Sequence, residues 1–153
     1  MNETLRRIVK TEPEWGATVA RLVLGLVMFP HAAQKVFGWF GGGGISGTIG
    51  FFESIGIPSF LAALVIAAEF LGSLALLLGA FGRLGAAAVS VVMLGAIAKV
   101  HWANGFFMNW FGQQAGEGFE YHLLALGLAA VVLIRGSGAA SIDAALGGGE
   151  TQA

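Results

Sequence analysis

The chain has 153 residues, of which 56% are hydrophobic and only 11% are charged, whereas an ordinary soluble domain has roughly 25% charged residues. Its formal net charge of −1 excludes the strongly basic surface by which proteins bind nucleic acid, so no nucleic-acid partner is expected. The absence of cysteine excludes a thiolate nucleophile, a dithiol mechanism and cysteine-ligated iron–sulfur clusters within this chain.

Four apolar segments are long enough to cross the ~30 Å hydrocarbon core of a membrane as helices. They are expected over residues 17–37, 60–81, 84–102 and 119–134, and the last needs its polar start to reach the interface. Residues 1–16 and 136–153 are expected as tails on either side of this membrane domain, 17–135. The first segment is too long for the apolar part of a typical signal peptide, so it is interpreted as a span.

Two shorter helices are expected outside the spans. Ile45, Ile49 and Phe52 follow the i, i+4, i+7 spacing of one helical face, which predicts a short helix lying in the interface within the first outer loop. The Gly56-Ile57-Pro58 sequence ends it. After the last span, Ser141-Ile142-Asp143 indicates a short helix with a serine cap.

The positions of Lys and Arg predict the orientation of the bundle. Arg6, Arg7 and Lys10 precede the first span, Arg83 lies between spans two and three, and Arg135 follows the fourth. The connections 38–59 and 103–118 contain neither residue. The four spans predict a four-helix transmembrane bundle, and the positive-inside rule places both of its termini in the cytoplasm. The expected location is the cytoplasmic (inner) membrane of a bacterium. Arg21, at the inner end of span one, is expected to reach the cytoplasmic head groups.

Seven ionisable residues lie inside or at one end of these apolar segments. Charge is costly in hydrocarbon, so such residues are a functional-site hypothesis by default. The predicted orientation places nearly all of them in the outer half of the bilayer. They are His31, Lys35, Glu69, Lys99, His101, Glu120 and His122.

Glu69 is expected to face the bundle interior and to pair with a basic residue, because pairing reduces the cost of a buried charge. His31 and Lys35 are four residues apart and share a helix face. Lys99 and His101 are only two residues apart, as are Glu120 and His122, so one member of each pair is expected to point away from the site. The alternative interpretation is that these residues are ion pairs that only fix helix register.

The outer tryptophans and the histidines each allow more than one interpretation. Trp39 and Trp102 lie at outer ends of spans, where they form either an interfacial belt or the walls of a site for a flat apolar ligand. No tight ligand spacing such as H-x-x-x-H occurs, so no metal site is expected. A b-type haem held by His31 with either His101 or His122 is a less favoured alternative.

An ordered series of short motifs from about Arg21 to Leu146 resembles the DoxX family of small four-helix membrane proteins. The resemblance rests on Gly25, His31, Lys35, Gly47-Thr48, Phe51-Phe52-Glu53, Gly56-Ile57-Pro58, Ala68-Glu69-Phe70-Leu71-Gly72, Gly79, Arg83-Leu84, His101, Gly105-Phe106-Phe107, Glu120-Tyr121 and Ser141-Ile142-Asp143. It implies a membrane subunit associated with redox chemistry. Some members of that family are partners of thiosulfate:quinone oxidoreductase, and others belong to membrane-bound oxidoreductase complexes that act in the response to oxidative stress.

The favoured function is a membrane component of an oxidoreductase system that binds a quinone-like ligand near the outer leaflet. Glu69, His31 and His101 are the candidates for proton exchange. Lys35, Lys99, Glu120, His122, Trp39 and Trp102 are the candidates for ligand binding. Electrons would come from a soluble or membrane redox partner. A proton-coupled carrier of a small molecule and a scaffold without chemistry are the alternatives; a homo-oligomer is compatible with all three.

Overall fold

The computed structural model describes residues 3–147, all of whose regular structure is helical. Its α-helices are α1 (Glu3–Val9), α2 (Trp15–Phe37), α3 (Gly44–Ser54), α4 (Ser59–Leu78), α5 (Gly82–Ala96), α6 (Glu120–Arg135) and α7 (Ile142–Gly147). A short 3-10 helix, η1 (Trp39–Gly41), follows α2. A π-helical segment, η2 (Ile97–His101), and a 3-10 turn, η3 (Trp102–Asn104), prolong α5.

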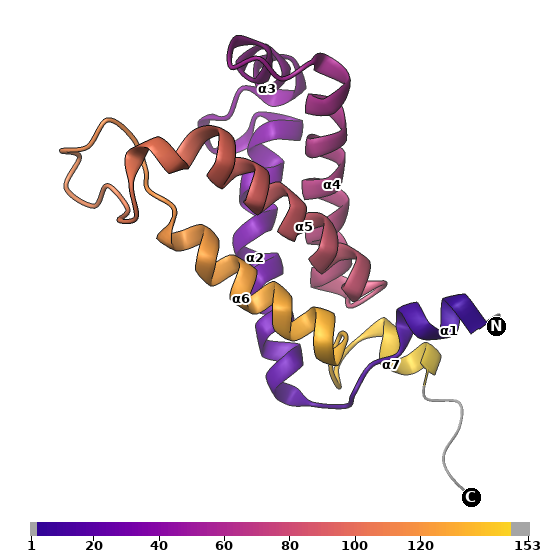
Figure 1. Ribbon diagram of the computed structural model, residues 1–153. Helices are drawn as coiled ribbons and strands as arrows, with labels where there is room; N and C mark the ends of the chain where they lie inside the picture. Colours follow the sequence, from indigo (N-terminus) through magenta and orange to yellow (C-terminus); the bar gives the residue numbers. More distant parts are fainter. Residues whose placement is uncertain (1–2, 148–153) are drawn as a thin grey trace, which may run out of the picture.

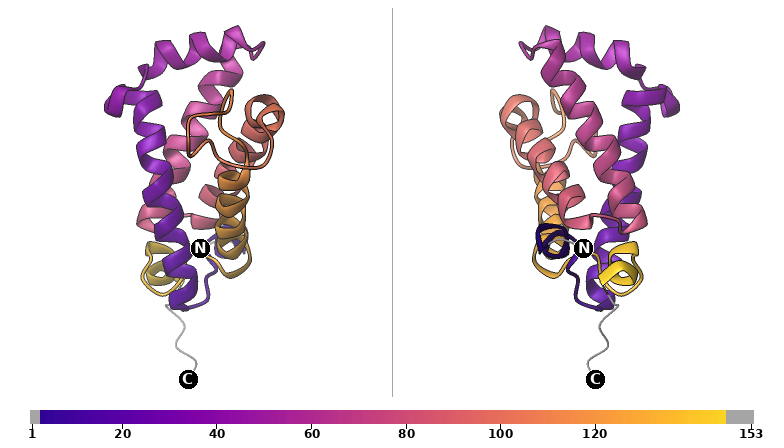
Figure 2. Two further views of the ribbon diagram at one scale, coloured as in Figure 1. Left: turned by 90° about the vertical axis from the view of Figure 1, so that its left-hand side faces the viewer. Right: turned by 90° about the vertical axis from the view of Figure 1, so that its right-hand side faces the viewer.

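Helices α2, α4, α5 and α6 form the predicted four-helix bundle, in which α2 and α5 each pack against both α4 and α6. Figure 1 shows α3 at one end of the bundle, and α1 and α7 together at the other. In the two views of Figure 2, α3 bridges the ends of α2 and α4, so it covers the part of that end that these two helices form. The prediction of a short helix in this connection is confirmed.

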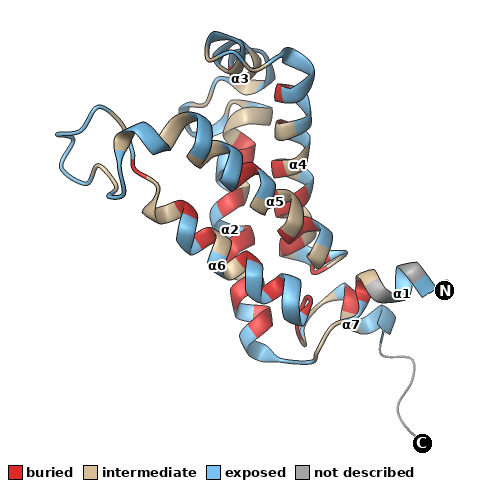
Figure 3. Ribbon diagram, viewed as in Figure 1, coloured by how far each residue is buried: buried red, intermediate tan, exposed pale blue. Residues whose placement is uncertain are grey.

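Within the described residues 3–147, three helices are long and apolar enough to cross a membrane: Trp15–Phe37, Ser59–Leu78 and the continuous helix Gly82–Asn104. Helix α6 has 16 residues and is shorter than these three. Figure 3 shows buried residues along the inward sides of the bundle helices and exposed residues on their outward sides. Large apolar side chains such as Leu26, Leu64, Val91 and Leu124 are exposed there, as expected of helices that contact lipid.

The core runs along the bundle axis and consists of aliphatic and methionine side chains. Close approach of α4 to α5 requires glycine: a Cβ on Gly72 would lie 3.2 Å from the Gly85 carbonyl oxygen, and one on Gly85 would lie 2.9 Å from that of Gly72. Small residues at such crossings let membrane helices pack through their backbones. The core comprises Leu24, Met28, Leu76, Ala86, Val89, Val92, Met93, Ala125, Ala129 and Val132.

Arg21 differs from its prediction, because it does not extend toward head groups. Its side chain is 1% exposed and donates hydrogen bonds to the carbonyl oxygens of Leu76, Leu77 (2.8 Å), Ser137 (2.9 Å) and Ala140 (2.6 Å). The carbonyls at a helix C-terminus lack partners within the helix and attract a cation. Arg21 binds the carbonyls at the end of α4 in this way. The chain after α6 folds back and encloses the Arg21 side chain.

Asp143 complements Arg21 at the start of the next helix. Its carboxylate accepts hydrogen bonds from the backbone N–H groups of Phe81 (2.8 Å) and Gly82 (2.9 Å) and from the Ser137 hydroxyl (2.6 Å). An anion is favourable at a helix N-terminus. The predicted cap of α7 is confirmed, since the Ser141 hydroxyl accepts a hydrogen bond from the Ala144 N–H at 3.1 Å. We call Arg21, Ser137 and Asp143 the closed-end network.

Candidate functional site

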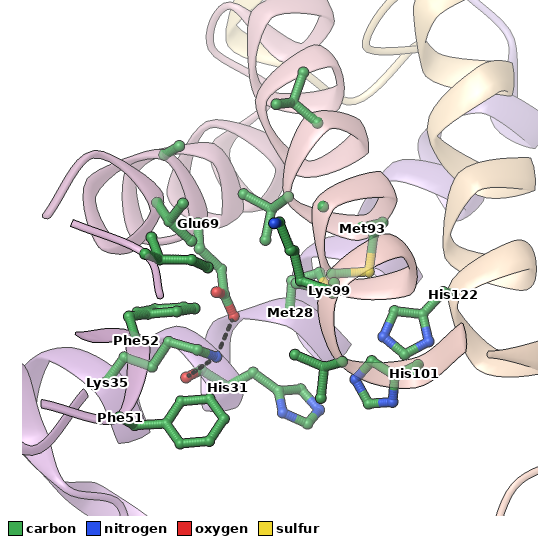
Figure 4. Close-up of a pocket in the computed structure, with 18 of the residues that line it drawn as sticks. Met28, His31, Lys35, Phe51, Phe52, Glu69, Met93, Lys99, His101 and His122 are labelled. Atoms are coloured by element: carbon green, nitrogen blue, oxygen red, sulfur yellow. Dashed lines mark hydrogen bonds and ion pairs between the residues drawn. The ribbon is translucent and has the colours of Figure 1, made fainter. Parts of the chain in front are cut away.

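A cavity of about 740 Å³ opens at the α3 end of the bundle. Most of its wall is apolar, and its polar side chains come from α2, α4, η2, α6 and the loop before α6 (Figure 4). The polar and charged lining residues are His31, Lys35, Glu69, Lys99, His101, Glu117, Tyr121 and His122. Pockets of this size and character hold small organic ligands.

Glu69 and Lys35 form an ion pair at the cavity wall. The Lys35 Nζ lies 2.9 Å from Glu69 Oε1, and the side chains are 28% and 2% exposed, respectively. Lys35 Nζ also donates to the His31 carbonyl oxygen, 3.3 Å away. The predictions that Glu69 faces the interior and pairs with a basic residue are confirmed. Glu69 Oε2 makes no hydrogen bond to any residue in 3–147.

His101 and His122 form a second polar group in the same cavity. Their ring centroids are 4.1 Å apart, and His101 Nδ1 donates to the Glu117 carbonyl oxygen at 2.8 Å. This bond leaves Nε2 of a neutral His101 as an acceptor. His122 is 6% exposed, and its Nδ1 is buried with no hydrogen-bond partner among the described residues. A buried polar atom without a partner is uncommon and calls for a ligand or water.

His31 lies between these two groups in Figure 4. Its ring centroid is 6.1 Å from that of Tyr121, and the Tyr121 hydroxyl contacts Met28 Sδ at 3.8 Å. Tyr121 belongs to the aromatic residues at the predicted outer ends, which were expected as an interfacial belt or as walls of a site, whereas Phe51 and Phe52 of α3, which also line the cavity, were not predicted as site residues. The signal available in the sequence was their place in the motifs Phe51-Phe52-Glu53 and Glu120-Tyr121.

Lys99 lines the cavity across from Glu69 (Figure 4). It makes no hydrogen bond or ion pair with any residue between positions 3 and 147. We expected only one of Lys99 and His101 to face the site, and the structure differs, because both line the cavity. The long lysine stem and the change of helical geometry in the π-helical segment Ile97–His101 account for the difference, and such π turns are frequent at functional sites.

Three predicted ligand-binding residues lie outside the cavity lining: Glu120, Trp39 and Trp102. The Glu120 carboxylate turns toward the preceding loop, where Oε1 accepts hydrogen bonds from Met108 N (2.9 Å) and Trp110 Nε1 (3.2 Å). The expectation that Glu120 and His122 point apart is therefore confirmed.

The tryptophan rings pack against neighbouring aromatic residues. Trp102 stacks on Phe119, with centroids 5.4 Å apart and planes tilted by 8°. Trp39 packs against Phe37, with centroids 4.9 Å apart. Both tryptophans are more than half exposed, which is the arrangement of an interfacial belt.

Comparison with known proteins gives two matches. The sequence profile of the DoxX family matches residues 16–102. A protein of Bacillus subtilis (strain 168), named "Putative oxidoreductase CatD", is 32% identical over 96 residues, which cover 63% of this chain and 67% of that protein. No solved structure matches the chain. The matched profile includes Lys35, Glu69 and His101 and ends before His122.

Proposed function

The chain belongs to the DoxX family, and from that premise we propose that it is the membrane component of an oxidoreductase system and binds a quinone-like ligand in the cavity beneath α3. The name of the Bacillus subtilis relative supports an oxidoreductase role. A chemical site, as distinct from a scaffold, is supported by the polar groups that remain available at the cavity wall.

We place four spans in the membrane: α2, α4, the continuous helix from α5 to η3, and α6. The 16 residues of α6 extend roughly 24 Å, so the turns at its ends complete the crossing. Both termini are then cytoplasmic, and the cavity lies in the outer half of the bilayer. The basic residues Lys10, Arg83 and Arg135 support this orientation, because Arg83 bonds to the carbonyls of Lys10 and Ile134 at the end of the bundle opposite α3.

Reporter fusions test the orientation. Fusions after Gly50 and after Gln113 are expected to read as external, and fusions before Trp15 and after Gly147 as cytoplasmic. A cytoplasmic signal at either of the first two positions would contradict the orientation and would move the cavity to the inner leaflet.

One observation carries the functional proposal: a single apolar cavity receives an ion-paired acid, a lysine that makes no hydrogen bond or ion pair within residues 3–147, and a buried imidazole whose Nδ1 has no hydrogen-bond partner among those residues. These are Glu69, Lys99 and His122, from three different helical segments. An apolar wall suits the ring of a quinone, and the polar groups suit its oxygens. Residues whose charge is costly in this environment are retained at functional sites more often than elsewhere.

The chain's own residues then supply protons and positive charge. Reduction of a quinone consumes two electrons and two protons, and the electrons come from a partner protein. Glu69 and the His101–His122 pair exchange protons with the ligand oxygens, since a carboxyl group and an imidazole nitrogen can each donate or accept a proton. Lys35 and Lys99 stabilise negative charge on those oxygens, and the low dielectric of the cavity strengthens that interaction.

Retention of quinone through purification tests the proposal. Protein isolated from membranes in a mild detergent is expected to retain quinone, detected by absorbance and mass spectrometry. Glu69→Gln is expected to lose it. Glu120→Gln is the matched control, because it makes the same change in an acid outside the cavity and keeps an acceptor oxygen for Met108 N. Wild-type protein that retains no quinone and binds no added quinone analogue would overturn the proposal.

A further inference from the structure

A second, smaller cleft of about 300 Å³ lies between the outer part of α2 and α3. Its wall contains three glycines, a threonine and a glutamine, unlike the apolar wall of the main cavity. Three of its residues, Lys35, Phe51 and Phe52, also line the main cavity, so they form the partition between the two spaces. The full lining is Gln34, Lys35, Gly42, Gly43, Gly47, Thr48, Phe51 and Phe52.

Lys35 is the polar member of this partition. In Figure 4 its side chain lies between the labelled rings of Phe51 and Phe52, and its ammonium reaches Glu69. Glu69 is 2% exposed, whereas Lys35 is 28% exposed. An ammonium has three N–H donors. Two are taken by Glu69 Oε1 and the His31 carbonyl oxygen, which leaves one for water.

We propose that Lys35 relays protons between water in the small cleft and Glu69 in the apolar cavity. The Lys35 ammonium transfers a proton to the Glu69 carboxylate, so that one N–H bond breaks and one O–H bond forms. The neutral amine then takes a proton from hydronium in the water of the cleft, which leaves a neutral water molecule, and Glu69 passes its own proton to the ligand. No electron moves in these steps. The proposal rests on the proposed function for the identity of the final proton acceptor.

The two spaces therefore have separate roles. The main cavity takes the apolar ligand, and the small cleft supplies protons from water without exposing the ligand. The partition of Phe51 and Phe52, with ring centroids 5.8 Å apart, keeps the rest of the boundary apolar.

Helix α3 offers a matched pair of variants that test the route. A Cβ on Gly47 or on Gly50 would meet no atom within 4 Å, so a first side-chain carbon fits at either position without a clash. Gly47 lines the small cleft, whereas Gly50 lines neither space. Gly47→Leu is therefore expected to obstruct the cleft, whereas Gly50→Leu adds the same side chain to the same helix outside it.

The first measurement is water access to Lys35. Full-length protein in lipid nanodiscs is treated with sulfosuccinimidyl acetate, a charged amine reagent that does not enter hydrocarbon, and acetylation of Lys35 is quantified by mass spectrometry. Wild type and Gly50→Leu are expected to react at the same rate, and Gly47→Leu is expected to lose most of the reaction. Equal reaction in Gly47→Leu and Gly50→Leu, or none in wild type, would overturn the proposal.

The second measurement is the relay itself. Infrared spectroscopy after a pH jump follows the protonated carboxyl band that is absent in Glu69→Gln. The band is expected to respond more slowly in Gly47→Leu and in Lys35→Met than in wild type, with Gly50→Leu unchanged. Equal rates in all four proteins, or no Glu69 band, would overturn the relay. Neither measurement uses a ligand, so a failure of quinone binding would disprove the proposed function and leave these results to decide the relay separately.

Discussion

Glu69 and Asp143 are equally buried, since each residue is only 2% exposed. The number of hydrogen bonds that their carboxylates accept differs. At the closed end, the two oxygens of Asp143 accept three hydrogen bonds, from two backbone N–H groups and a hydroxyl. In the cavity, Glu69 has one ion pair on one oxygen, and its other oxygen makes no hydrogen bond within the described residues 3–147.

The difference separates a buried charge that stabilises the fold, Asp143, from one that remains available to a ligand, Glu69. In the closed-end network, Arg21 donates to backbone carbonyls at the end of α4, and Asp143 accepts from backbone N–H groups at the start of α5. Few of its donors and acceptors remain for a ligand. In the cavity, Glu69, Lys99 and His122 each keep a hydrogen-bond donor or acceptor that no residue within 3–147 uses. Because unsatisfied buried polar groups cost stability, we expect changes at the closed end to affect folding and changes in the cavity to affect binding.

The largest expected effect on stability is that of Arg21→Met. It removes the donors for four carbonyl oxygens and is expected to lower the free energy of unfolding by about 3–5 kcal/mol. Lys35→Met likewise replaces a cation of α2 with methionine. It is expected to lower the free energy of unfolding much less, because Glu69 can then accept a proton and lose its charge. Thermal melts in detergent measure both. An equal loss in the two variants would remove the distinction between the two ends.

A smaller loss is expected for Gly82→Ala. A Cβ at this position would collide with the Ser137 hydroxyl of the closed-end network, and overpacking of this kind costs about 1–3 kcal/mol. Gly127→Ala in α6 is the control, since its Cβ would meet nothing within 4 Å, and it is expected to be neutral or to gain up to about 1 kcal/mol. A stable Gly82→Ala protein would mean that the Ser137 contact is easily displaced.

The smallest predicted effect is that of Ser141→Ala. This change removes the cap of α7, whose hydroxyl accepts from Ala144 N, and is expected to cost about 1 kcal/mol. Ser54→Ala at the end of α3 removes an exposed hydroxyl whose one hydrogen bond within the described part of the chain is to the Phe51 carbonyl, and the melting temperature is expected to shift by less than in Ser141→Ala. Neither change should alter quinone-analogue binding, and a loss of binding in Ser141→Ala would couple the two ends of the bundle.

The spans and the Glu69 pair could be predicted from the sequence because each follows from a local rule. A run of apolar residues of sufficient length predicts a membrane helix, and a lone acid within it requires a partner. The short helix α3 was predictable from its apolar spacing. The bounds of the predicted fourth span were harder to place, because α6 has only 16 residues and the loop before it carries no periodic pattern.

The closed-end network and the full cavity wall could not be predicted in this way. Arg21 bonds to Ser137 and Ala140, which are 116 and 119 positions away in the sequence, and no local pattern shows that the chain after α6 returns to α2. Phe51 and Phe52 reach the cavity only because α3 folds over the bundle end. The positions of Trp39, Trp102 and Glu120 likewise depend on how their side chains turn, which helix assignment alone does not determine.

The most direct test of the account compares Glu69→Gln with Asp143→Asn, two nearly isosteric changes at equally buried carboxylates. For each variant, the melting temperature and the affinity for a quinone analogue are measured in the same detergent. We predict that Glu69→Gln melts close to wild type and loses binding, whereas Asp143→Asn melts at a clearly lower temperature and, while folded, binds as wild type does. A Glu69→Gln protein that loses stability and keeps wild-type affinity would contradict the account and would make the Lys35–Glu69 pair a structural one.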